Sequence, residues 1–199
     1  GSEMCIRDRF KSRVLRGFFV LVVERGAMSK RRVVVTAAGM LSPCGVTVEE
    51  SWTAILDGHS GISAITEFDT TDYPTKFAGL VPEFDLDQYM SVKDARKMDL
   101  FIQYGMVSAI QAVEQSGLME ASFDPTRIGV SIGSGIGGLT LIEDTTLLLN
   151  KRGPRKVSPF FVPGSIINMI AGNLAIKYGF QGPNIAITTA CTTSTHCIG

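Results

Sequence analysis

The sequence is poor in the features that mark several large classes of protein. Its 199 residues include only four cysteines, two histidines and one tryptophan, and its 19 basic residues are balanced by 19 acidic ones. That balance argues against a strongly basic nucleic-acid-binding protein, and a hydrophobic content of 45% argues against disorder. No apolar run reaches the roughly 18 residues that a membrane-spanning helix requires. We therefore expect a globular chain that binds no nucleic acid and has no membrane span.

The cysteines are too few and too widely spaced for a disulfide scaffold. Cys5, Cys44, Cys191 and Cys197 include no C-x-x-C pair of the kind that binds zinc. Sparse cysteines are typical of the reducing cytoplasm, where a single one is more often a buried thiol or a nucleophile than half of a disulfide. The sequence therefore indicates a cytoplasmic protein without a metal site.

Residues 1–27 differ from the rest of the chain in charge. They hold six basic and three acidic residues, whereas residues 28–199 hold 13 basic and 16 acidic ones. The apolar run 17–23 raises the question of a secretory signal, but Glu24 and Arg25 stand where a small-residue cleavage site belongs. The acidic residues also fit poorly with an organelle transit peptide. We interpret residues 1–27 as an extraneous or upstream extension, expect it to be disordered, and take Met28 as the natural start.

Beyond Met28 the hydrophobic pattern predicts strands that alternate with helices. The predicted strands are 32–36, 127–132 and 184–188. The first predicted helix is capped by Thr47 and ends at Gly58, and an irregular stretch follows at 60–92. The other predicted helices are 93–116, 139–150 and 165–178. Gly117 and Gly179 are suited to end the second and fourth helices. This alternation implies an α/β protein with a mainly parallel sheet covered on both faces. Because a new helix begins just before Gly199, we expect the chain to be a truncated piece.

A glycine-rich loop follows the second predicted strand. Gly133, Gly135 and Gly138 satisfy the pattern G-x-G-x-x-G between a strand and a helix, as a dinucleotide-binding turn would. That turn also needs an acidic residue about 20 positions later, and no Asp or Glu follows Asp144. No G-K-[ST] phosphate loop occurs either, so we expect no cofactor. The loop is interpreted either as close backbone packing or as space beside a ligand, with Ile136 projecting from it.

Cys191 is the strongest candidate for chemistry. The apolar strand 185–190 runs straight into it, and small residues that are compatible with a helix follow. A cysteine at the N-terminus of a helix is favoured as a thiolate, and backbone N–H groups at such a turn are suited to stabilise an oxyanion. The alternative is a small buried residue. A cysteine nucleophile needs a base or a cation beside it. Neither histidine is a convincing partner. We expect His196 to be packed in the core and His59 to lie in a surface loop.

Several motifs follow one another from Met28 almost to the end of the chain. They are M-S-K-R-R-V-V-V-T at 28–36, G-M-L-S-P at 39–43, R-K-M-D at 96–99, F-I-Q-Y-G at 101–105, I-G-S-G-I-G-G at 132–138, G-P-R-K at 153–156, S-P-F-F-V-P at 158–163 and T-A-C at 189–191. In this order they resemble the β-ketoacyl-acyl-carrier-protein synthases, condensing enzymes of the thiolase-like fold, and most closely the type II elongating synthase. The resemblance implies that residues 28–199 form the N-terminal half of a layered α-β-α domain with a mainly parallel sheet.

The resemblance also implies an activity in fatty-acid elongation. Cys191 would accept an acyl chain as a thioester, which is then attacked by the carbanion equivalent formed when malonyl-acyl carrier protein loses CO2. Ile136 matches a residue at the acyl pocket of the family. Phe161 matches a residue that reaches the pocket of the partner subunit in a homodimer.

A basic cluster matches the surface on which the family docks the acyl carrier protein. Lys93, Arg96 and Lys97 are the main candidates, and Arg155 and Lys156 are weaker ones. Independently of the resemblance, three cations at the start of the predicted helix 93–116 oppose its dipole, which is tolerable where a partner's negative charge meets them. A solvated helix end is the alternative.

The sequence departs from the family in ways that keep other interpretations open. Residues 193–197 mix features of the type I and type II synthases, so the chain-length class is uncertain. The two catalytic histidines, the lysine and the phenylalanine gate of the family match nothing in this chain, so we expect the chain alone not to elongate acyl groups. The alternatives are a polyketide ketosynthase and a non-catalytic partner similar to a chain-length factor, although the latter lacks the nucleophile.

Overall fold

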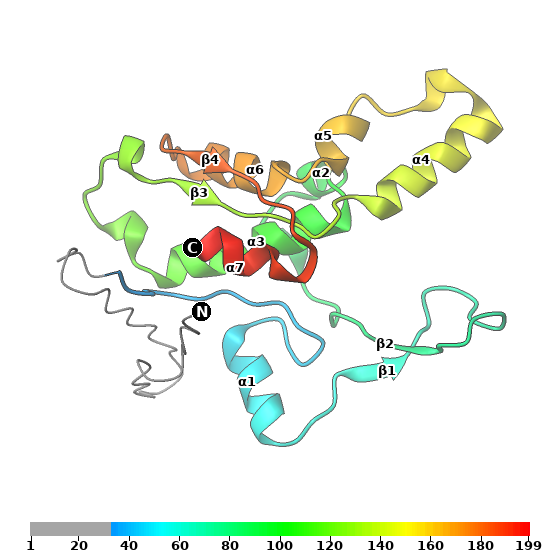
Figure 1. Cartoon of the computed structure of the whole chain (residues 1–199), viewed down its shortest axis with the longest axis horizontal. Helices are drawn as coiled ribbons and strands as arrows, with labels where there is room; N and C mark the ends of the chain where they lie inside the picture. Colours follow the sequence, from blue (N-terminus) through cyan, green and yellow to red (C-terminus); the bar gives the residue numbers. More distant parts are fainter. Residues whose placement is uncertain (1–32) are drawn as a thin grey trace, which may run out of the picture.

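The structure is a computed structural model that describes residues 33–199 (Figure 1). The extension predicted at 1–27 and the first residue of the predicted strand 32–36 lie outside these residues. The helices are α1 (Val48–Leu56), α2 (Val92–Ala95), α3 (Leu100–Gln115), α4 (Leu139–Arg152), α5 (Phe161–Ser165), α6 (Met169–Tyr178) and α7 (Thr193–Ile198). Short 3-10 turns are η2 (Leu86–Gln88), η3 (Leu118–Glu120), η4 (Pro125–Arg127), η5 (Pro154–Lys156) and η6 (Ala190–Thr192). The strands are β1 (Ile62–Ala64), β2 (Phe77–Gly79), β3 (Val130–Ser131) and β4 (Asn184–Ile185).

Strands β3 and β4 form a parallel pair, as the sequence predicts. Val130 lies opposite Asn184 and Ser131 opposite Ile185, and α4, α5 and α6 make up the crossover between the two strands. Both strands are shorter than the predicted 127–132 and 184–188, because 125–127 form a 3-10 turn and residues beyond Ile185 make no further ladder. The protein is therefore an α/β protein with a parallel sheet. The stretch 60–92, predicted to be irregular, contains the antiparallel hairpin of β1 and β2.

The predicted strand at 32–36 is wrong in the part that the structure describes. Residues 33–41 belong to no strand, and the second half of this segment docks on α3 through two glutamine side chains. Gln115 Oε1 accepts a hydrogen bond from the backbone N–H of Ala38, and Gln111 Oε1 accepts one from Met40, each at 3.0 Å. A side chain at Gly39 would collide with the backbone of α3. Side-chain amides of α3 therefore satisfy two backbone groups of the segment that follows the predicted strand.

The single helix predicted at 93–116 is also wrong, because it is broken into α2 and α3. Asp99 is the N-cap of α3, and its carboxylate accepts a hydrogen bond from the N–H of Phe101 at 3.2 Å. Gln103 Nε2 donates to the carbonyl of Met98 at the break and to that of Ala95, which also accepts from the N–H of Met98. The polar side chains on both sides of the break therefore replace the lost backbone bonds.

The other helices follow the prediction more closely. Thr47 caps α1 by accepting a hydrogen bond from the N–H of Glu50. Gly117 and Gly179 have left-handed backbone angles (φ 67° and 71°) at the ends of α3 and α6, as predicted. Helix α6 begins at Met169, four residues later than the predicted 165–178, because α5 and a short link precede it.

The core lies where α6 packs on α3 and on β3. Its buried side chains include Ile102, Met106, Ile110, Val130, Ile170 and Leu174. An added Cβ at Gly105 would lie 2.6 Å from the Ile170 side chain, so α3 and α6 approach closely at this glycine. This packing fixes β3 and β4, and therefore also the two loops that leave their carboxyl ends. Within the described residues no helix is both long and apolar enough to cross a membrane.

Candidate nucleophile site

Two loops meet at the carboxyl ends of β3 and β4. One is the glycine loop (residues 133–138), which leads from β3 into α4, and the other is the nucleophile turn (residues 189–193), which leads from β4 toward α7 (Figure 1). An added Cβ at Gly133 would lie 1.8 Å from the carbonyl oxygen of Ile187, and one at Gly135 would lie 3.6 Å from Cα of Ala190. The first glycine is therefore required by close backbone packing, which was one of the two interpretations of this loop.

The nucleophile turn is closed by hydrogen bonds among its own residues. The N–H of Thr189 donates to Thr193 Oγ1 at 2.9 Å, and Thr193 Oγ1 donates to the carbonyl of Ala190 at 2.8 Å. The N–H of Thr192 donates to the carbonyl of Thr189 at 3.1 Å. Ala190 has φ 50°, and it is the one non-glycine residue among those described with a positive φ. The chain therefore makes a sharp, strained turn immediately before Cys191.

Cys191 itself is exposed and lies in the 3-10 turn η6. It precedes α7 by two residues rather than beginning it, and α7 has only six residues. The helix dipole therefore stabilises a thiolate at Cys191 less than the sequence suggested. Cys44 and Cys197 are half-buried free thiols. Among residues 33–199, no hydrogen bond reaches Cys191 Sγ, and no three His, Cys, Asp or Glu side chains gather as a metal site requires. The alternative of a buried small residue is excluded by this exposure.

The two histidines lie on the surface. His196 was expected in the core, but it is exposed on α7, where its Nδ1 lies 2.8 Å from Thr189 Oγ1. The prediction for His196 is therefore wrong, because this side chain bonds back to the start of the nucleophile turn instead of packing inward. His59 is exposed, as predicted, and lines a shallow hollow with acidic residues of α1. No residue of the nucleophile turn lines that hollow.

The glycine loop connects the nucleophile turn to α5, on which Phe161 lies. Ile136 projects from the middle of the loop with 68% of its surface exposed. At the end of the loop the N–H of Gly138 donates to the carbonyl of Ser165, the last residue of α5, at 3.0 Å. Phe161 is half-buried at the first position of α5. The fold thus brings the segments of Cys191, Ile136 and Phe161 into one continuous region.

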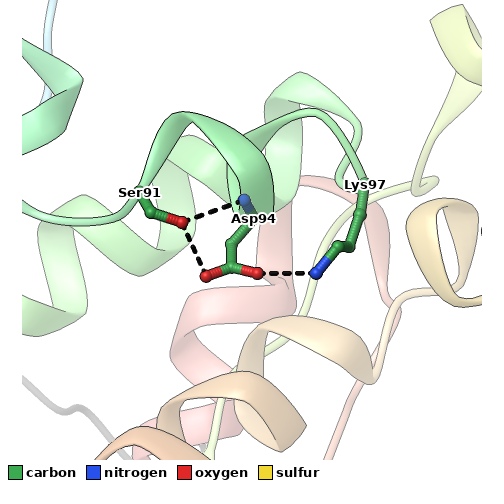
Figure 2. Close-up of polar contacts among 3 residues, drawn as sticks. All are labelled: Ser91, Asp94 and Lys97. Carbon is green, nitrogen blue, oxygen red and sulfur yellow. Dashed lines mark hydrogen bonds and ion pairs between the residues drawn. The ribbon is translucent and has the colours of Figure 1, made fainter.

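The basic residues at 93–97 lie around α2, not at the start of a long helix. Lys93 is in α2, Arg96 is its C-cap and Lys97 follows, so two of the three cations stand at a helix C-terminus, where the dipole favours them. The argument that these cations oppose a dipole is therefore wrong. Lys97 Nζ pairs with Asp94 Oδ1 at 2.7 Å. The Ser91 hydroxyl donates a hydrogen bond to Asp94 Oδ2 and accepts one from the N–H of Asp94 (Figure 2).

Arg155 and Lys156 are exposed in η5, shortly before α5. Lys97 lies beside the segment that follows η5, because its ammonium is 5.5 Å from the centre of the Phe160 ring. The N–H of Asp99 also donates to the carbonyl of Gly164 at 3.0 Å. The ends of α2 and the segment that follows η5 therefore pack against each other.

Sequence reasoning missed two residues that hold this site together. Thr193 closes the nucleophile turn, and Asp99 bonds both to α3 and to the N–H of Leu141 in α4, at 2.7 Å. Asp99 carried a readable signal, since Asp is a preferred N-cap residue and hydrophobic residues follow it. Thr193 carried none, because its role depends on a backbone conformation that the sequence does not specify.

Comparison with known proteins agrees with this geometry. The family described as "Beta-ketoacyl synthase, N-terminal domain" matches residues 30–199, which include both loops of the site. The chain belongs to this family.

A 3-oxoacyl-[acyl-carrier-protein] synthase 2 of Vibrio cholerae serotype O1 is 66% identical over 172 residues, which cover 86% of this chain and 42% of that protein. The protein of the same name from Coxiella burnetii is 51% identical, again over 86% of this chain and 42% of the relative. The chain thus spans less than half the length of these relatives.

Solved structures share the same thiolase-like ketosynthase fold. The ishigamide ketosynthase/chain length factor superposes with a TM-score of 0.72 at 25% identity, covering 81% of this chain and 40% of that one. A ketosynthase in complex with its type II polyketide acyl-carrier protein gives a TM-score of 0.67 at 23% identity, covering 83% of this chain and 45% of that one. The fold and the family predicted from the sequence are confirmed.

Proposed function

We propose that this chain contributes the acyl-accepting step of a 3-oxoacyl-[acyl-carrier-protein] synthase in fatty-acid elongation, with Cys191 as the nucleophile. The observation that carries the proposal is the exposed thiol of Cys191 in a hydrogen-bonded turn at the carboxyl end of β4, next to the glycine loop. Ligands and reacting groups in α/β proteins bind at the carboxyl ends of parallel strands. The curated relatives named as such synthases support the same activity.

The acyl-transfer step needs only a thiolate and a thioester. The sulfur of Cys191 attacks the carbonyl carbon of an acyl group carried as a thioester, a new C–S bond forms, and the C–S bond to the carrier breaks. The carrier leaves as a thiolate and takes up the proton that Cys191 has lost. The acyl group is then held on the protein as a thioester.

The condensation step uses a malonyl thioester as the second substrate. Loss of CO2 releases the electron pair of the broken C–C bond, which forms a new bond to the acyl carbon and expels the sulfur of Cys191 as a thiolate. This step requires groups that stabilise the negative charge developing on the malonyl carbonyl oxygen. No hydrogen bond reaches Cys191 Sγ from the described residues, so we assign this polarising role to residues beyond them.

Ile136 and Phe161 are proposed to contact the acyl chain. The exposure of Ile136 beside the nucleophile turn and the connection of the glycine loop to α5 support this role. For Phe161 we propose contact with the acyl pocket of a second subunit, which makes the working form a homodimer. The apolar side chains of Phe160 and Val162 beside it, 46% and 57% exposed, are suited to such an interface.

The proposed partner is the acyl carrier protein, both acyl- and malonyl-loaded. Lys93, Arg96, Lys97, Arg155 and Lys156 would meet its acidic surface. The packing of Lys97 on Phe160 supports a single docking surface, because it brings the first basic segment next to the chain that follows the second. The free thiols among the described residues support a location in the cytoplasm.

A carrier-loading assay tests the proposal. The protein is incubated with acyl carrier proteins of fatty-acid and of polyketide synthesis, each loaded with the same acyl group, and acyl transfer is followed by mass spectrometry. We expect transfer from the fatty-acid carrier to the wild-type protein and none to the Cys191→Ala variant, with Cys197→Ala as the matched control that keeps transfer. Preferred loading by the polyketide carrier would instead assign a polyketide ketosynthase, and loading by neither carrier would assign a non-catalytic partner.

A further inference from the structure

Thr193 makes two hydrogen bonds to the two residues that precede the proposed nucleophile. Its hydroxyl accepts from the N–H of Thr189 at 2.9 Å and donates to the carbonyl of Ala190 at 2.8 Å. The residue is only 6% exposed, although every other residue of α7 is exposed or half-buried. A buried hydroxyl that both donates and accepts has its main hydrogen-bonding capacity used within the turn.

The bonds of Thr193 hold a backbone conformation that the chain does not favour. Ala190 has φ 50°, which is costly for a residue with a Cβ, and it directly precedes Cys191. The carbonyl that the Thr193 hydroxyl bonds belongs to this strained residue, and the N–H that it bonds belongs to the residue before it. Without the hydroxyl, the carbonyl of Ala190 would keep the backbone N–H of Thr193 as a donor, but the N–H of Thr189 would lose its partner inside the turn.

The methyl group of Thr193 adds a contact to the second loop of the site. A Cβ placed on Gly133 would lie 2.6 Å from Thr193 Cγ2, so the methyl group occupies the space that the glycine leaves free. The glycine loop continues from this contact to Ile136. One side chain thus touches both the turn that carries Cys191 and the loop that carries the proposed acyl-contacting residue.

We propose that Thr193 is a positioning residue for acyl transfer: its hydroxyl fixes the turn that carries Cys191, and its methyl group sets the spacing between that turn and the glycine loop. The inference rests on the proposed role of Cys191 as the acyl-accepting nucleophile. Thr193 does not touch the acyl group, so its loss changes the geometry of the thiol and leaves the binding of the carrier unaltered.

Three substitutions at Thr193 separate the role of its hydroxyl from that of its methyl group. Thr193→Val removes the hydroxyl and keeps the shape, Thr193→Ser keeps the hydroxyl and removes the methyl group, and Thr193→Ala removes both. Thr195→Val is the matched control, because Thr195 lies exposed on the same short helix and its hydroxyl has no hydrogen-bond partner among the described residues. Circular dichroism establishes that each variant folds.

The first measurement is single-turnover acyl transfer to Cys191 at increasing concentrations of acyl carrier protein. For T193V we expect the limiting rate to fall by about tenfold or more, because misplacement of a reacting group is costly, while the half-saturating carrier concentration stays within about twofold. T193S should retain about a third or more of the wild-type rate, and T195V should be unchanged. Alkylation of Cys191 by iodoacetamide, which needs no aligned complex, should change by less than about threefold in all variants.

The second measurement is hydrogen exchange at the backbone amide of Thr189, which donates to the Thr193 hydroxyl. We expect exchange to accelerate in T193V and T193A and to stay at the wild-type rate in T193S and T195V. If T193V does not fold, the pair T193S and T193A, which differ only in the hydroxyl, gives the same comparison.

The outcomes distinguish this inference from the proposed function. If the wild-type protein accepts no acyl group on Cys191, the proposed function fails and this inference fails with it. If the wild-type protein is acylated and T193V is acylated equally fast, or T193S is as slow as T193A, only the positioning role of Thr193 is overturned.

Discussion

Lys97 is the proposed docking residue whose charge is already engaged within the protein. Its ammonium pairs with Asp94 at 2.7 Å and also lies over the ring of Phe160. An acidic partner that binds Lys97 must therefore compete with Asp94 for the same ammonium group. An exposed pair of this kind contributes little to stability, so the competition is weak but measurable.

Replacing Asp94 by asparagine should strengthen binding of the acyl carrier protein. The Asp94→Asn substitution frees Lys97 and keeps the oxygen that Ser91 contacts in Figure 2. We expect affinity to rise about two- to fivefold at low salt and the gain to shrink as salt is added. Titration of labelled carrier protein by fluorescence anisotropy measures the effect. Asp72→Asn, which removes an exposed acidic charge in the region between β1 and β2, is the control, and an equal gain in that variant would contradict docking at Lys97.

The same pair makes a prediction about pH. Hydrogen bonds from Lys97 and then from Ser91, with the charge of Lys97, hold the pKa of Asp94 below its usual value of 3.8. A lowered pKa means that the carboxylate stabilises the folded chain fully above the unfolded value and loses this effect as the pH falls through the folded one. We expect an NMR titration to place the midpoint of Asp94 below 3.8 and Lys97→Ala to shift it upward. A midpoint that Lys97→Ala leaves unchanged would show that the pair does not form in solution.

At the scale of elements, the break between α2 and α3 connects the proposed docking residues to the candidate nucleophile site. Asp99 uses both carboxylate oxygens: one accepts from Phe101 in α3 and the other from Leu141 in α4. Helix α4 begins at the end of the glycine loop, and the N–H of Asp99 bonds to α5. A continuous helix at 93–116 would give Asp99 no such position.

Asp99→Asn should destabilise the fold more than an ordinary cap substitution does. Asparagine has one acceptor oxygen, so its amide nitrogen would face either the N–H of Phe101 or that of Leu141. Asp99 is 8% exposed, and we expect a loss of about 1–3 kcal/mol in the free energy of unfolding. Asp124→Asn is the matched control, because Asp124 caps η4 through Oδ1 alone and should change little. Urea denaturation of the two variants compares them; equal stability would contradict the two-oxygen role of Asp99.

The elements also show what the sequence can and cannot predict. Helix ends set by one residue, such as Thr47, Gly117 and Gly179, were predicted correctly because local capping and left-handed glycine decide them. The strand at 32–36 was not, because a β-branched run indicates only an extended chain, and residues 33–36 pair with no strand among the described residues. At the site, Cys191 was proposed from its context, and the structure shows that it is exposed. The burial of Thr193 and the exposure of His196 depend on how the nucleophile turn folds, which local pattern does not determine.

At the scale of the whole molecule, large apolar side chains remain exposed over much of the described surface. Ile198, Ile176 and Val33 are 79%, 78% and 76% exposed, and Val162 on α5 is 57% exposed. Apolar surface of this extent marks contact with other protein surface. For the α5 region we propose the second subunit of a homodimer as that contact.

A charge on α5 should therefore separate the subunits. We expect light scattering to give the wild-type chain a mass of twice 21.4 kDa and the Val162→Asp variant a mass near 21.4 kDa, because a buried unpaired carboxylate disfavours the interface. Gln181→Glu, which adds the same charge at an exposed turn before β4, should stay dimeric. A wild-type protein that is monomeric at high concentration, or a Val162→Asp variant that stays dimeric, would contradict the assignment of α5 to the interface.

The central claim is that Cys191 accepts the acyl group, and peptide mass spectrometry tests it most directly. The protein is incubated with acyl carrier protein that bears a labelled acyl group, and the peptides that contain Cys44, Cys191 and Cys197 are compared. We predict that the mass of the acyl group appears on the Cys191 peptide and on neither of the other two. Acylation of Cys44 or Cys197, or of none of the three in a folded protein, would contradict the claim.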